Sequence, residues 1–158
     1  MNQILQYVKV HNMDKFYVHN YNIKTYLQTI LRAMHKDKFV PDVVIGLSRG
    51  GLQPAVMLSN YFDVPMIPVS LALRDHQVEK VDFELDPNKK YLVIDDINDS
   101  GATLNRLAQY MNEHTWRSAV LINNLPSPFE PDYYGMEINK DEEDVWVVYP
   151  WEEWWQSN

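Results

Sequence analysis

The residues best suited to chemistry in this sequence lie in one stretch that changes from apolar to polar within a few positions. A run of apolar residues, 91–94, leads directly to two acids, Asp95 and Asp96. Ionised carboxylates only accept hydrogen bonds, so the pair suits the hydroxyls of a sugar or a Mg²⁺ ion, which prefers oxygen ligands. The two acids therefore predict a site for a diol or a divalent cation.

The residues that follow the acids suit a different group. Leu104 and Leu107 recur at helical spacing, so a helix should begin near Ser100. A helix N-terminus presents unpaired N–H groups and a partial positive charge. Gly101 lets a ligand approach the backbone, and Thr103 adds a hydroxyl. This turn therefore predicts a phosphate site, and a phosphorylated ribose would use the turn and the acids together.

The whole stretch resembles the phosphoribosyl pyrophosphate (PRPP) signature of type I phosphoribosyltransferases, in which two acids end a strand and Asp-Thr/Ser-Gly leads to a helix. A plain helix cap would explain a polar turn, but neither the paired acids nor the Gly-x-Thr pattern. The resemblance implies that Asp95 and Asp96 bind the ribose hydroxyls or the metal, with Asp96 as metal ligand. It implies that Asp99 is the general base near the purine. The 5′-phosphate would lie at Ser100, Gly101, Ala102 and Thr103.

A second glycine-containing loop follows another apolar run, Val43 to Leu47, and precedes a helix expected from about Leu52 to Phe62. Two glycines free the backbone to wrap an anion, and an arginine supplies a permanently charged fork for phosphate oxygens, although a plain turn would also explain the glycines. In xanthine-guanine phosphoribosyltransferases, which the chain is similar to here, a Ser-Arg-Gly-Gly-Leu loop binds pyrophosphate. The resemblance implies a pyrophosphate site at Ser48, Arg49, Gly50 and Gly51.

The C-terminal part of the chain carries residues suited to a flat base. Residues 145–152 return to strand character and resemble the Asp-x-Trp-x-x-x-Pro-Trp-Asp/Glu block of the same enzymes. The resemblance implies that Trp146 stacks on the purine and Val147 borders it; the alternative is that Trp146 is core. The family lysine that donates to the purine 6-oxygen is here Asn124, or Asn123 with a one-residue shift, and asparagine lacks the charge. Asn124→Lys should then improve use of 6-oxopurines.

Alternating strands and helices must bring the two loops together. Apolar residues from Ile23 to Met34 recur at helical spacing, and strand-like runs at 43–47, 66–73, 91–94 and 118–122 are separated by further helical patterns. This alternation predicts an α/β, three-layer fold with a mainly parallel twisted sheet and its ligand at the carboxyl ends of the strands. The resemblance implies the type I phosphoribosyltransferase fold, with a small C-terminal hood over the base.

Length and composition fit a single domain. The 158 residues can bury a substantial core, and no linker or repeat is evident. We expect one phosphoribosyltransferase domain over residues 1–158, with a core at about 20–125 and a base-binding hood at about 126–158. The irregular segment from Leu73 to Lys90 is expected to be a lid or a solvated charged loop.

Charge and composition argue against several classes of function. The net charge of -8 disfavours nucleic-acid binding. The absence of cysteine excludes disulfides and thiolate chemistry, and the scattered histidines argue against a zinc site. No leader or membrane-spanning run is evident, so we expect a cytoplasmic protein with no membrane partner. Tryptophans crowd the C-terminus and need cover, which favours a homo-oligomer or packing back onto the domain.

The resemblance implies a reaction: transfer of 5-phosphoribose from PRPP to a purine base, with Mg²⁺ as cofactor and pyrophosphate as leaving group. The expected base is a 6-oxopurine, namely guanine, xanthine or hypoxanthine. Two alternatives stay open, which are the same chemistry on another base and a non-catalytic PRPP-sensing regulator on the same fold.

Overall fold

The computed structural model describes residues 13–70 and 84–156. Among these residues the central element is a five-stranded sheet with the strand order β3-β2-β4-β5-β6, and each neighbouring pair is parallel. A parallel sheet needs cover on both faces, which is why its inner strands contain continuous apolar runs. The strands are β2 (Val43–Leu47), β3 (Met66–Val69), β4 (Lys90–Asn98), β5 (Thr115–Asn124) and β6 (Tyr133–Ile138).

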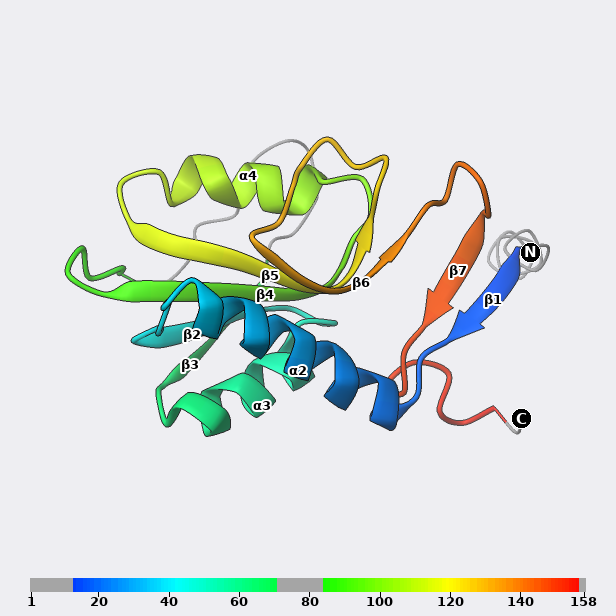
Figure 1. Cartoon of the computed structure of the whole chain (residues 1–158), viewed down its shortest axis with the longest axis horizontal. Helices are drawn as coiled ribbons and strands as arrows, with labels where there is room; N and C mark the ends of the chain where they lie inside the picture. Colours follow the sequence, from blue (N-terminus) through cyan, green and yellow to red (C-terminus); the bar gives the residue numbers. More distant parts are fainter. Residues whose placement is uncertain (1–12, 71–83, 157–158) are drawn as a thin grey trace, which may run out of the picture.

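The helices of the described residues cover the two faces of this sheet. In Figure 1, α4 lies on one side of the sheet, and α2 and α3 lie on the other. Their bounds are Asn20–Lys36 for α2, Leu52–Phe62 for α3 and Ala102–Tyr110 for α4. The predicted α/β, three-layer fold with a mainly parallel sheet is confirmed. None of these helices has the length and apolar character that a membrane span requires.

Apolar side chains of the sheet alternate between two cores. Ile30 of α2 and Leu92 of β4 belong to one core, whereas Leu107 of α4 and Val93 of β4 belong to the other. Because successive residues of a strand point to opposite faces, β4 packs against helices on both sides. The central strand of the sheet therefore carries the acid pair near its carboxyl end.

A second, two-stranded sheet joins the two ends of the described chain. It pairs β1 (Asp14–Tyr17) with β7 (Val145–Val148) in parallel, and it stands beside the main sheet in Figure 1. Lys15 lies opposite Trp146, and the Lys15 ammonium also pairs with the Glu153 carboxylate at 2.7 Å. This small sheet places Trp146 beside the carboxyl end of the main sheet.

The strand that carries the acids is longer than its apolar run predicts. The sequence predicts a strand over 91–94 with the acids beyond its end, but β4 continues to Asn98. The reason is that β5 pairs with β4 as far as Asn98 opposite Asn123, and backbone pairing does not depend on apolar side chains. Asp95 and Asp96 are therefore held in a strand rather than in a loop.

Other boundaries differ for the same reason, because the neighbouring strand decides where pairing ends. β5 extends beyond the predicted 118–122 at both ends, and β7 stops at Val148 because β1 ends opposite it. The predicted strand at 66–73 ends at Val69. Its last three positions and most of the predicted lid, residues 71–83, lie outside the described residues.

Candidate active site

The two glycine-containing turns open into one cleft. β2 and β4 are neighbours in the parallel sheet, so the turns that follow them lie at the same edge. Ser48, Arg49 and Gly50 line a cleft of about 300 Å³ together with residues 95–104. The structure thus brings the predicted pyrophosphate loop, the acid pair and the predicted 5′-phosphate turn to a common space. Gly51 is the exception, because it is buried beneath its loop and does not line the cleft.

The turn before α4 is built to leave backbone N–H groups free. Gly101 is the residue before the helix and has a φ of 79°, a conformation that L side chains rarely adopt. Within the described residues, the one side-chain hydrogen bond to the amides of residues 100–103 is long, from the Ala102 amide to the Ser100 hydroxyl at 3.4 Å. Unpaired amides at a helix N-terminus attract anions. The local geometry therefore suits a phosphate group.

The loop after β2 touches strand β4 through Gly50 and Asp96. A β-carbon at Gly50 would collide with the Asp96 carboxylate, so only glycine leaves room for this acid. We therefore expect Gly50→Ala to displace the carboxylate and raise the KM for PRPP, the substrate that the sequence resemblance implies, on the order of 10- to 100-fold, as small misplacements in active sites do. Steady-state kinetics would measure this, with the melting temperature as a check on folding. A correctly folded Gly50→Ala protein with an unchanged KM would contradict the contact.

Asp95 and Asp96 are close to each other and partly buried in strand β4. Burial raises the pKa of both carboxyl groups, and the neighbouring Asp96 charge raises that of Asp95 further. Each carboxylate accepts one backbone N–H, from Asp96 and Ile97 respectively, both at 2.9 Å. Within the described residues neither acid pairs with a cation. The pair is therefore electrostatically poised to accept a positive ion or hydrogen-bond donors.

A tyrosine that the sequence analysis did not single out ties the C-terminal segment to the acids. The Tyr149 hydroxyl donates to the Asp96 carbonyl oxygen at 2.7 Å, and its ring stacks on Trp151 at 4.8 Å between centroids. Burial, followed by the charges of the two acids, raises the pKa of Tyr149 and keeps the donor protonated. Its only signal in the sequence is its place in the Tyr-Pro-Trp run.

Removal of this hydroxyl should loosen the acid pair. Tyr149→Phe loses one buried hydrogen bond but keeps the stacked ring, so we expect a loss of about 1 kcal/mol in the free energy of unfolding. Chemical denaturation measures this loss. Tyr110→Phe is the matched control, because Tyr110 of α4 is exposed and its hydroxyl makes no hydrogen bond within the described residues. Equal stability of the two variants would refute a supporting role for Tyr149.

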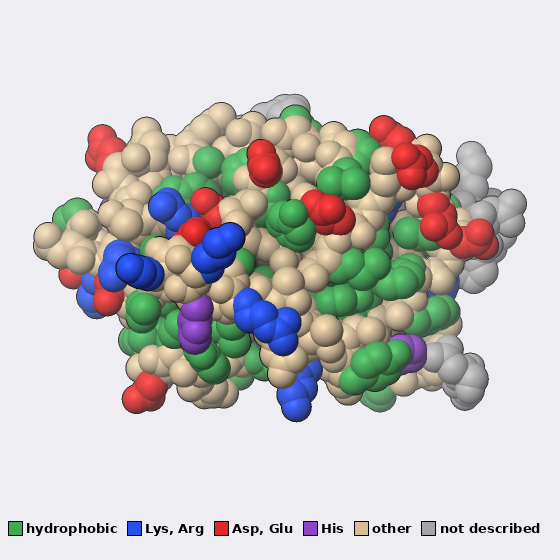
Figure 2. Space-filling model, in the orientation of Figure 1, with side chains coloured by type: hydrophobic (Ala, Val, Ile, Leu, Met, Phe, Trp, Pro, Cys, Tyr) green, Lys and Arg blue, Asp and Glu red, His purple; other side chains and the backbone are tan. Residues whose placement is uncertain are grey.

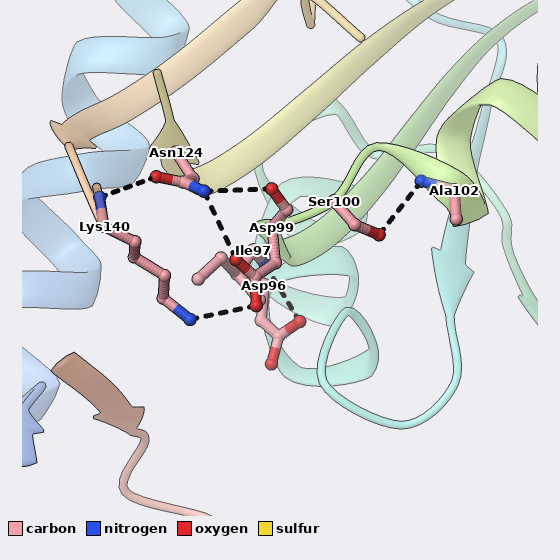
Figure 3. A network of polar contacts seen from close by, with 7 residues as sticks. All are labelled: Asp96, Ile97, Asp99, Ser100, Ala102, Asn124 and Lys140. Atoms are coloured by element: carbon pink, nitrogen blue, oxygen red, sulfur yellow. Dashed lines mark hydrogen bonds and ion pairs between the residues drawn. The ribbon is translucent and has the colours of Figure 1, made fainter. Parts of the chain in front are cut away.

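Asp99 lies in a network with Asn124 and a lysine that the sequence analysis also missed. The Asn124 amide donates to the Asp99 carbonyl oxygen at 3.1 Å and to its carboxylate at 3.4 Å. The Lys140 ammonium pairs with the other Asp99 carboxylate oxygen at 2.9 Å. Figure 3 shows the side chains of Asn124 and Lys140 both directed at Asp99. A lysine in an otherwise acidic loop was the signal available in the sequence.

The neighbouring Asn123 has a structural role instead. Its side-chain oxygen accepts a hydrogen bond from Asn98 at 2.8 Å, and Asn98 also donates to the Phe129 carbonyl oxygen at 2.7 Å. Ser127 completes the network by donating to Asn98 at 3.2 Å. These buried amides fix the segment after β5, so Asn124 is the one of the two asparagines that meets Asp99.

The two predicted base-flanking residues lie in different surroundings. Trp146 is 44% exposed and lines a second cleft, of about 690 Å³, with Trp151 on its wall. Arg49, Gly50 and Asp96 line both clefts, so the aromatic wall adjoins the cleft of the two glycine-containing turns. The alternative that Trp146 is core is wrong. Val147 is buried among apolar side chains and lines neither cleft.

Comparison with known proteins gives a consistent result. The family model for the phosphoribosyl transferase domain matches residues 17–157. A xanthine-guanine phosphoribosyltransferase from Idiomarina loihiensis is 26% identical, with 69% of this chain and 70% of that protein covered. A purine phosphoribosyltransferase structure from Pyrococcus horikoshii superposes with a TM-score of 0.72 at 28% identity, covering 89% of this chain and 96% of that one. The xanthine-guanine-hypoxanthine phosphoribosyltransferase of Helicobacter pylori, at 20% identity, shares the fold, with a TM-score of 0.68 and coverage of 88% and 94%.

Proposed function

The chain belongs to the phosphoribosyl transferase domain family, and from this premise we propose that it transfers 5-phosphoribose from PRPP to a 6-oxopurine. The predicted family and enzyme class are confirmed by the family match. The observation that supports the finer assignment most is the shared cleft, because PRPP carries anionic groups at both ends of one sugar. Ser48, Arg49 and Gly50 line this cleft together with the turn before α4.

The roles follow from the chemistry of each group. The Arg49 guanidinium and the loop amides would bind the pyrophosphate, and the N-terminus of α4 would bind the 5′-phosphate. Asp95 and Asp96 would accept hydrogen bonds from the ribose hydroxyls. The Trp146 ring would stack on the base from the β1–β7 sheet, with Val147 supporting it from the core. We propose that this sheet and the C-terminal segment form the hood over the base.

Mg²⁺ fits the acid pair. Mg²⁺ is usually held by one or two carboxylates together with substrate phosphates and water, and Asp95 and Asp96 supply two carboxylates with no cation partner in the described residues. Asp96, which also abuts Gly50 of the pyrophosphate loop, would be the ligand. When bound, the ion neutralises charge on the leaving pyrophosphate.

The transfer itself exchanges one bond at the anomeric carbon for another. The bond from the anomeric carbon to the pyrophosphate oxygen breaks, and a purine ring nitrogen forms the new bond. Asp99 would accept the proton that the purine loses. A carboxylate nearby would also stabilise the positive charge that develops on the ribose ring.

Pyrophosphate release tests the proposal directly. Purified protein with PRPP and Mg²⁺ is incubated with guanine, xanthine, hypoxanthine, adenine or orotate, and both products are measured. Pyrophosphate and a nucleoside monophosphate should form with at least one of the three oxopurines. Turnover with adenine or orotate alone would assign another base. PRPP binding without turnover on any base would favour a regulator.

The oligomeric state stays a prediction. Trp154 and Trp155 are 75% and 65% exposed at the C-terminal end of the described chain, whereas Trp151 packs against the core. Of these three tryptophans, only Trp151 packs back onto the domain. We expect a second copy of the chain to cover Trp154 and Trp155, and light scattering coupled to size-exclusion chromatography would measure the mass of the assembly.

A further inference from the structure

We propose that Lys140 recognises the carbonyl oxygen of the base and makes the pocket select 6-oxopurines. The inference rests on the proposed function, whose expected base-contacting residue is Asn124. It assigns that contact to a lysine from another part of the chain, and it makes Asn124 a positioning residue for Asp99 and Lys140.

Asn124 is already engaged on both sides of its amide. Its nitrogen donates to Asp99 twice, at 3.1 Å to the carbonyl oxygen and 3.4 Å to the carboxylate. Its oxygen accepts the backbone N–H of Lys140 at 3.0 Å. The side chain carries two donors, and both are directed at Asp99. Because Asn124 is buried, a base would have to break these bonds to reach it.

The Lys140 side chain points into the protein, although the acidic side chains of its own loop lie at the surface. The four residues that follow it, 141–144, are all acidic and exposed. Figure 2 shows acidic side chains gathered at the end of the molecule where the segment between β6 and β7 lies. A flexible lysine would find partners there without burial, yet its side chain is only 15% exposed and reaches Asp99, 41 positions away in sequence. The fold therefore holds this ammonium at the candidate general base.

The edge of a 6-oxopurine matches an ammonium next to a carboxylate. The 6-oxygen and ring nitrogen N7 lie side by side on that edge. If the Asp99 carboxylate accepts the N7 proton, the Lys140 ammonium paired with it lies next to the 6-oxygen. An ammonium has three donors, so Lys140 can keep Asp99 and still donate to a carbonyl oxygen. Adenine would present an amino group, also a donor, to the same ammonium, and this mismatch disfavours it.

The test compares bases in variants of this lysine. Lys140→Met removes the charge and keeps much of the length, Lys140→Arg keeps the charge, and Lys24→Met is the control on the exposed face of α2. We expect Lys140→Met to raise the KM for guanine and hypoxanthine on the order of 10- to 100-fold, the effect of losing a hydrogen bond from a charged donor. The KM for PRPP should change less than about threefold, and the preference for oxopurines over adenine should fall. Lys140→Arg should retain part of the preference for oxopurines, and Lys24→Met should have the same KM values and base preference as the unmodified protein.

Calorimetric binding of GMP, AMP and ribose 5-phosphate provides a readout without turnover. Lys140→Met should weaken GMP binding and leave ribose 5-phosphate binding unchanged. If Lys140→Met weakens the binding of GMP and AMP equally, or weakens the binding of ribose 5-phosphate, the role of Lys140 is merely structural and the inference is overturned. Full oxopurine preference in Lys140→Met would overturn it while the proposed function stands. If the unmodified protein turns over only adenine, or binds GMP no better than AMP, both the oxopurine assignment and the role of Lys140 fail.

The inference also reverses the expectation for Asn124→Lys. A second ammonium at this position would lie beside Lys140 and would remove the amide that holds Asp99. The substitution should therefore lower kcat/KM for oxopurines rather than improve it. Improved use of guanine by Asn124→Lys would favour the direct base contact and contradict the positioning role.

Discussion

Asp99→Asn should lower kcat on the order of 10²- to 10⁴-fold, which is the usual contribution of a positioned general base. The Asp99 side chain is half-exposed where it lines the cleft, and Asn124 and Lys140 hold it in place. Asparagine has nearly the same shape, and its oxygen can still accept from Lys140, but the amide cannot take the proton from the purine. The loss should therefore appear in kcat, with the KM for PRPP changed much less.

Asp63→Asn is the matched control for this substitution. Asp63 follows α3 with a φ of 54°, where asparagine is well tolerated, and it lies outside both clefts. The Asp63→Asn variant should retain full activity. Stopped-flow or steady-state assays of pyrophosphate release would compare the kcat of Asp63→Asn with that of Asp99→Asn. A loss smaller than about tenfold in Asp99→Asn would remove Asp99 from the role of base.

Asp95→Asn should abolish most activity and yet stabilise the fold. Burial and the Asp96 charge raise the pKa of Asp95, so the folded state binds its proton more tightly than the unfolded state does. The contribution of this group to stability is fully present below the ordinary carboxyl pKa of about 4 and is lost as pH rises through the raised pKa. Ionisation of this side chain in the folded protein therefore costs stability, and a neutral amide removes that cost.

Two measurements check this second prediction. Urea denaturation near neutral pH should show a free energy of unfolding about 1–3 kcal/mol higher for Asp95→Asn, the scale of desolvating one polar group. The difference in unfolding free energy should shrink as the pH is lowered toward about 4, because Asp95 is then protonated and as neutral as the asparagine of the variant. Addition of Mg²⁺ with PRPP should raise the melting temperature of the unmodified protein more than that of the variant. A variant that is less stable at every pH would show that Asp95 holds the fold together instead of serving the ligand.

The sequence by itself determined the helices and most core strands, but not β1 or β6, and it located the two glycine-containing turns. Apolar spacing is a local property, so α3, β2 and the start of β4 follow from it directly. The glycines, hydroxyls and acids of the turns are likewise contiguous in sequence. Parallel strands then place their carboxyl ends at one edge, which is why a shared cleft could be predicted without coordinates.

Only the tertiary structure decided which side chains surround Asp99 and Asp96. Lys140 meets Asp99 across 41 positions, Asn124 meets it across 25, and Tyr149 meets Asp96 across 53. The physical reason is that such contacts depend on strand register and on the path of a loop. Neighbouring residues of a strand point to opposite faces, so a one-residue shift would exchange Asn123 and Asn124. The register of β5 against β4 is set by packing along both strands, and no local pattern in the sequence encodes it.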